Sequence, residues 1–122
     1  MDIPLHITQT DKLNGKITDV RVESVDNYPA MTANISHTDV RWFMKNTTAH
    51  FFTKIVGSPK RIPVLEFGDD GIRSLANDTE DDNLLNLDDI EIEPELNPLD
   101  FKELQQWVEQ MENTLIQPST FE

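Results

Sequence analysis

The stretch that decides the fold runs from residue 3 to residue 25 and reads IPLHITQTDKLNGKITDVRVESV. Its first half places an apolar residue at every second position, which is typical of a half-buried strand. These positions are Ile3, Leu5 and Ile7. Asn14-Gly15 then predicts a tight hairpin turn, because both residues accept a positive φ at low cost. Residues 17–25 are expected to return as the second strand, with Val20 and Val22 facing inward.

The following residues alternate between loop, helix and strand patterns. We expect a loop over residues 26–35, and then a short helix over residues 38–46 that Ser36 or Thr38 caps. Residues 49–56 are rich in aromatic and β-branched side chains and predict a strand buried on both faces. Residues 61–67 and 72–76 flank a glycine-containing turn and predict a second hairpin, which Pro63 places at a sheet edge.

The C-terminal part predicts a longer amphipathic helix over residues 98–117. Asn97 fits its N-cap and Pro98 its first position. The apolar stripe consists of Phe101, Leu104, Trp107, Val108, Met111 and Leu115. This stripe either packs on the sheet or docks on a partner or a second copy of the chain, and Trp107 is the residue that tests the difference.

We therefore predict one α+β domain over residues 1–122. It would contain a small antiparallel sheet of about five strands with one short internal helix over residues 1–76, an acidic segment over residues 77–97, and the C-terminal helix. No cysteine occurs, which excludes disulfides and thiol chemistry. The sequence contains no secretory signal and no apolar run long enough to span a membrane, so we expect a cytoplasmic protein.

Charge is distributed unevenly along the chain. Residues 1–61 contain six acidic and eight basic side chains, whereas residues 62–122 contain seventeen acidic and two basic ones, so the two parts carry +2 and −15. Residues 78–95 hold nine carboxylates and no base. Such a field repels nucleic acids and anionic membranes. A protein with a basic surface is the partner that we expect.

Several short motifs resemble a small bacterial family that is known only as a domain of unknown function. They are Gly15-Lys16-Ile17-Thr18-Asp19-Val20 opening a strand, a short helix with Trp42, an aromatic strand, and Asp78-Thr79 ahead of Asn83-Leu84-Leu85-Asn86-Leu87. The resemblance extends from Leu13 to Leu87. It departs from the family pattern at Asn46-Thr47-Thr48, where a glycine is usual. The resemblance implies a small α+β fold and no activity.

The acidic segment also follows part of a calcium-loop template. Oxygen ligands at the template spacing are Asp78, Glu80, Asp82 and Asp89. Glu80 replaces the usual Asp or Asn, Asp89 replaces the usual bidentate Glu, and the flanking helices of such a site are not predicted. A solvated acidic face or a partner-binding surface is therefore the favoured interpretation. Its residues are Asp78, Glu80, Asp81, Asp82, Asp88, Asp89, Glu91 and Glu93, with Trp107 added from the helix.

Catalytic motifs are missing from the sequence. His6, His37 and His50 are the three histidines, and none has a ligand partner at metal spacing on a predicted helix. No Gly-x-Ser-x-Gly elbow and no glycine-rich phosphate loop occurs. The sequence thus predicts a non-enzymatic protein with no cofactor.

Three functional hypotheses follow. The leading one is a non-catalytic acidic module that covers a basic surface of a partner protein, in the manner of an inhibitor, an immunity protein or a nucleic-acid mimic. The second is a structural or accessory domain that forms a homodimer through the C-terminal helix. The third is a weak calcium-binding module.

Overall fold

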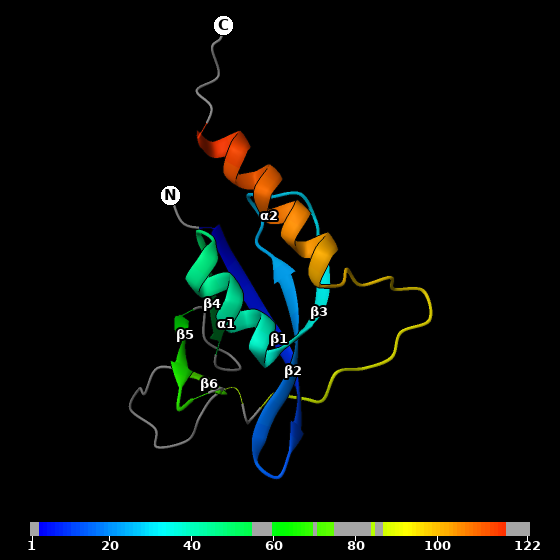
Figure 1. Cartoon of the computed structure of the whole chain (residues 1–122). Helices are drawn as coiled ribbons and strands as arrows, with labels where there is room; N and C mark the ends of the chain where they lie inside the picture. Colours follow the sequence, from blue (N-terminus) through cyan, green and yellow to red (C-terminus); the bar gives the residue numbers. More distant parts are fainter. Residues whose placement is uncertain (1–2, 55–59, 70, 75–83, 85–86, 117–122) are drawn as a thin grey trace, which may run out of the picture.

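The computed structural model describes residues 3–54, 60–69, 71–74, 84 and 87–116, with the backbone alone at 67 and 114–116. The described residues form six strands and two helices (Figure 1). In chain order these are β1 (Ile3–Leu13), β2 (Lys16–Ser24), β3 (Thr32–Ser36), α1 (His37–Asn46), β4 (Ala49–Lys54), β5 (Arg61–Phe67), β6 (Gly71–Ser74) and α2 (Phe101–Ile116).

The strands form one mixed sheet in the order β3-β2-β1-β4-β5-β6. β1 and β4 are parallel, and the other described neighbours are antiparallel. The α+β class is confirmed, and the predicted number of about five strands roughly fits the six that are found. The prediction of an antiparallel sheet is wrong, because the sheet is mixed. α1 crosses from the end of β3 to the start of β4, and such a crossover is what a parallel pair requires. The prediction of a loop over residues 26–35 is also wrong for residues 32–35, which belong to β3 and pair with β2.

The first hairpin is confirmed, with two irregularities. Asn14 and Gly15 adopt φ values of +53° and +77°, so both turn residues use the left-handed region. Val20 and Val22 are fully buried, as predicted. The pairing of β1 and β2 shifts between Ile7 and Gln9, and again between Asp11 and Lys12. The first shift changes which residues of β1 point into the core, so Thr10 is buried although it lies three residues after Ile7.

The second hairpin, β5–β6, is also present and lies at one edge of the sheet, as predicted, but the edge strand is β6 and not β5, which contains Pro63. β5 lies between β4 and β6 and is therefore an inner strand. Residues 61–63 pair with β4, and residues 64–67 pair with β6. Pro63 stands where the pairing changes from one neighbour to the other, so a residue without an N–H is accommodated inside the sheet.

The helices lie on the same side of the sheet (Figure 1). Ser36 caps α1 through a capping box with Asp39, which selects one of the two predicted caps. Val40 and Phe43 of α1 are fully buried. The ring of Phe43 lies 5.4 Å from that of Phe101, so aromatic contacts join the two helices.

α2 begins three residues later than predicted. Leu99 instead extends the edge of β3, because its N–H donates to Thr32 O at 2.8 Å and its carbonyl accepts from Asn34 N at 3.1 Å. Asp100 and Glu103 then exchange backbone-to-side-chain hydrogen bonds at the helix start. Asp100, not Asn97, therefore caps the helix.

Substitution of Gly15 by alanine is expected to destabilise the hairpin. Among the described residues beyond its two chain neighbours, none has an atom within 4 Å of the position that the new Cβ would occupy, so the cost comes from the positive φ. We expect a loss of about 1 kcal/mol in the free energy of unfolding, measured with urea. Lys16→Ala is the control, and an equal effect of both substitutions would contradict this explanation.

Candidate acidic binding surface

The acidic segment covers a part of β1 that β4 leaves unpaired. β4 pairs only with residues 3–6 of β1, which continues to Leu13. Beyond that point, Thr10 N donates to Asp88 O at 3.0 Å, and Thr10 Oγ1 donates to Leu84 O at 2.8 Å. Backbone groups of a strand need such partners when they are shielded from water. Leu84 and Asp88 of the segment are thus held by hydrogen bonds that β1 needs at Thr10.

Side chains of β1 hold the next residues. Lys12 Nζ donates to Leu87 O at 2.6 Å, and it also lies 3.4 Å from a carboxylate oxygen of Asp89. The Asp11 carboxylate accepts from Ile90 N at 3.0 Å. The Gln9 side chain accepts from Glu91 N at 3.2 Å. These bonds engage the backbone of the segment and leave most of its carboxylates in solvent.

Arg21 of β2 is the main anchor of the segment. Its neighbours Val20 and Val22 point into the core, so Arg21 points to the face of the sheet opposite the helices. Its side chain is 5% exposed and lies 2.8 Å from the Glu93 carboxylate. It also donates to Glu91 O at 2.7 Å and to Asn34 Oδ1 at 3.1 Å. A buried guanidinium needs several such acceptors, so the segment must pass over β2.

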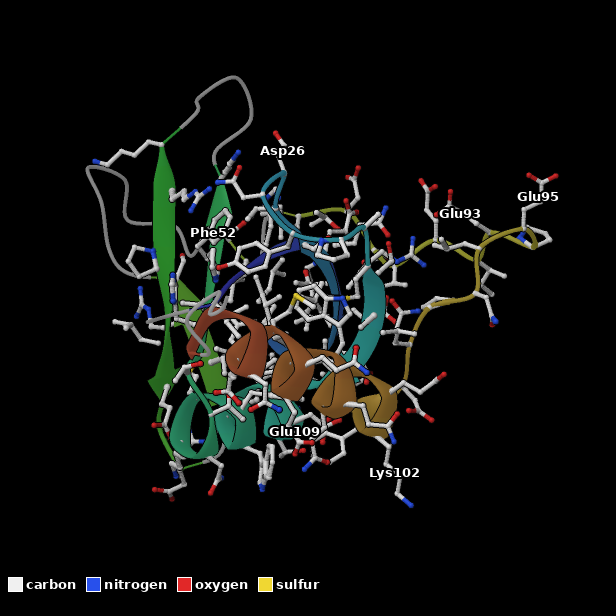
Figure 2. All side chains as sticks on the ribbon, turned by 90° about the horizontal axis from the view of Figure 1, so that it is seen from above. Asp26, Phe52, Glu93, Glu95, Lys102 and Glu109 are labelled. Atoms are coloured by element: carbon white, nitrogen blue, oxygen red, sulfur yellow. The ribbon has the colours of Figure 1, made fainter. Side chains whose placement is uncertain are left out.

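The described carboxylates of the segment face solvent. Figure 2 shows Glu93 and Glu95 on a loop beyond β3, away from the two helices. The exposed predicted binding residues are Asp88, Asp89, Glu91 and Glu93. Asp78, Glu80, Asp81 and Asp82 lie outside the described residues. Three of the four calcium candidates are among these, so the calcium hypothesis stays a prediction.

Trp107 lies apart from this acidic surface. It is partly buried against the core, and its ring centroid lies 6.1 Å from that of Tyr28. Leu104 and Val108 of the same stripe are fully buried. The described part of the stripe therefore packs on its own sheet. Polar residues such as Lys102 and Glu109 form the outer side of α2 (Figure 2).

His6 belongs to a second cluster, on the face of the sheet opposite the core. Its ring stacks on Phe52 at a centroid distance of 4.9 Å, and the Arg61 guanidinium lies 4.6 Å from the centre of the same Phe52 ring. Burial lowers the pKa of His6, Lys54 and Arg61 lower it further, and Glu23 opposes them. The neutral imidazole is thus the favoured form in the folded protein.

Sequence reasoning missed the anchors Arg21 and Lys12. By charge alone, both are ordinary basic residues of an N-terminal part that carries +2. The signal for Arg21 was its position between two inward-facing valines, which places it on the second face of an inner strand. That signal does not say what covers the second face, because the covering residues are about seventy positions away in the sequence.

Comparisons of the chain with protein-family models, with curated proteins and with solved structures found no match. The resemblance of residues 13–87 to a family of unknown function therefore stays a prediction. Within the described residues, no group of three His, Cys, Asp or Glu side chains is placed to hold a metal ion. Neither helix among them combines the length and apolar character that crossing a membrane requires.

Replacing Arg21 by methionine is expected to release the acidic segment. Glu93, Glu91 O and Asn34 Oδ1 would lose their donor, and we expect about 1–3 kcal/mol of lost stability in urea unfolding. Amide hydrogen exchange over residues 89–96 should become faster. Lys102→Met, on the exposed side of α2, is the matched control. Unchanged exchange over residues 89–96 in the Arg21 variant would show that Arg21 is not the anchor.

The lowered pKa of His6 predicts that the folded protein loses stability as the pH decreases. The unfolded state binds a proton near pH 6.5, whereas the folded state resists protonation to lower pH. Folding stability from this residue is thus present above about pH 6.5 and falls as the pH decreases below it. The free energy of unfolding of His6→Gln should fall less than that of the wild type between pH 7 and pH 5. Parallel curves for the two proteins would contradict the prediction.

Proposed function

We propose that the protein is a non-catalytic binding module whose acidic segment covers a basic surface of a partner protein. The observation that carries this proposal is the anchoring of the segment. Its backbone is held by Lys12, Arg21, Gln9 and Asp11, while the carboxylates of Asp88, Glu91 and Glu95 are exposed. Charges on a fixed backbone lose little conformational freedom when a partner binds.

Charge also determines the class of partner. Carboxylates spaced along an ordered backbone attract lysine and arginine side chains and accelerate encounter by electrostatic steering. A protein surface that normally contacts phosphate groups offers such side chains in a row. An inhibitor or immunity protein that occupies a nucleic-acid-binding surface is the biological role that fits this charge pattern best.

Two triple variants test this proposal with the same change in net charge. The first reverses Asp88, Glu91 and Glu95 to lysine, all on the acidic segment. The second reverses Asp26, Asp69 and Glu109, which are exposed elsewhere. None of these six carboxylates carries an ion pair described above, so both proteins should fold.

Partner capture from a bacterial lysate, with elution in salt steps, should separate the variants. The wild type and the second variant should retain the same basic protein and release it as salt rises, because exposed charge pairs are screened. The segment variant should bind that protein on the order of tenfold or more weakly, since like charges then face each other. If both variants weakened binding equally, the effect would depend only on net charge, and the proposal would be overturned. The absence of any charge-dependent partner would also overturn it.

A further inference from the structure

Residues 92–96 of the acidic segment border an open hollow on the surface. Leu96 N donates to Glu93 O at 2.9 Å, which closes a turn at residues 93–96. The turn and the residue before it surround an open space of about 490 Å³, lined by Ile92, Glu93, Pro94, Glu95 and Leu96. Apolar and acidic side chains therefore alternate around one concave site.

Ile92 is the unusual member of this lining. It is 95% exposed, more than Leu13 at 65% and Leu65 at 43%, the other large apolar residues that are exposed among those described. Single exposed apolar side chains are common on proteins. Ile92, however, shares its hollow with Pro94 and Leu96, so the three together offer apolar surface to one ligand group.

The carboxylates of the hollow are suited to a cation. Glu93 is held in place by Arg21 through Oε2 at 2.8 Å and keeps a half-exposed side chain. Glu95 is exposed on the same turn, and Figure 2 shows it at the outer end of the loop. Both glutamates line the hollow together with Ile92, so the hollow offers a cationic group carboxylates and an apolar side chain.

We propose that this hollow binds one arginine side chain of the partner. An arginine has an aliphatic stem that packs on apolar surface and a planar guanidinium that binds carboxylates through several donors. The stem would lie against Ile92 and Leu96, and the guanidinium would reach Glu93 and Glu95. This inference rests on the proposed function and adds to it the side chain that the acidic surface recognises.

The test uses the full chain and defined small ligands. A capped Gly-Gly-Arg-Gly-Gly peptide is titrated into ¹⁵N-labelled protein, and the amide shifts are followed by NMR. The same peptide with citrulline removes the charge but keeps the stem, and methylguanidinium keeps the charge but removes the stem. A lysine peptide compares the two cations.

The arginine peptide should shift the amides of residues 91–97 before others. Binding of the citrulline peptide and of methylguanidinium should each be weaker by roughly fivefold or more, because each has lost one of the two contacts. Ile92→Ser should weaken binding of the arginine peptide by a similar factor. Leu13→Ser, a comparable change at another exposed position, should leave this binding unchanged. Glu95→Gln should weaken binding of the arginine and lysine peptides but leave binding of the citrulline peptide unchanged.

Two results would overturn the inference. One is an arginine peptide whose shifts spread over all exposed carboxylates and do not depend on Ile92. The other is the absence of any shift at residues 91–97. The proposed function is judged separately, by the capture experiment. It fails if the segment variant and its matched control weaken partner binding equally, or if no charge-dependent partner is captured.

Discussion

The position of β1 between an antiparallel and a parallel neighbour is the constraint on which the rest of the structure depends. Its pairing with β2 is local and follows from a short turn. Its pairing with β4 is parallel, so the chain must cross the sheet between them, and α1 makes this crossing. Ile3, Leu5 and Ile7 have no exposed surface, because the helices cover the face toward which they point.

The second constraint acts on the opposite face of the sheet. An inner strand that carries Arg21 toward that face places a guanidinium where little water reaches it. Removing a charge from water costs several kcal/mol unless acceptors replace the water. Glu93, the Glu91 carbonyl and Asn34 supply these acceptors. The described residues of the acidic segment are thus held against the sheet by these contacts, although their composition resembles that of a solvated linker.

Local patterns predicted the elements that depend on local physics. The Asn14-Gly15 turn, the cap at Ser36 and the buried strand around Phe51 all follow from residues close together in the sequence. The parallel pairing of β4 and the edge contact of Leu99 with β3 did not follow, because both depend on distant residues. The pairing of Leu99 with β3 explains why α2 begins later than predicted, since an extended backbone that pairs with a strand cannot also begin a helix.

For the candidate site, too, local features could be predicted from the sequence and long-range contacts could not. Exposure of Asp88, Asp89, Glu91 and Glu93 could be predicted, because closely spaced carboxylates repel one another and favour water. The anchors of the segment could not, because they come from β1 and β2. The apolar lining of the hollow at residues 92–96 could not be predicted either, because nothing in the local sequence indicates that Ile92 faces solvent.

Net charge and fixed position have different physical consequences. Solubility depends on net charge and is indifferent to where on the surface the carboxylates lie. Recognition depends on position, because groups that must be ordered during binding reduce the affinity. The positive charges of Lys12 and Arg21 hold the acidic segment at the sheet through ion pairs with Asp89 and Glu93. These pairs oppose the mutual repulsion of the carboxylates in the segment. The anchors, more than the charge of −13 itself, therefore favour a binding surface over a solubility feature.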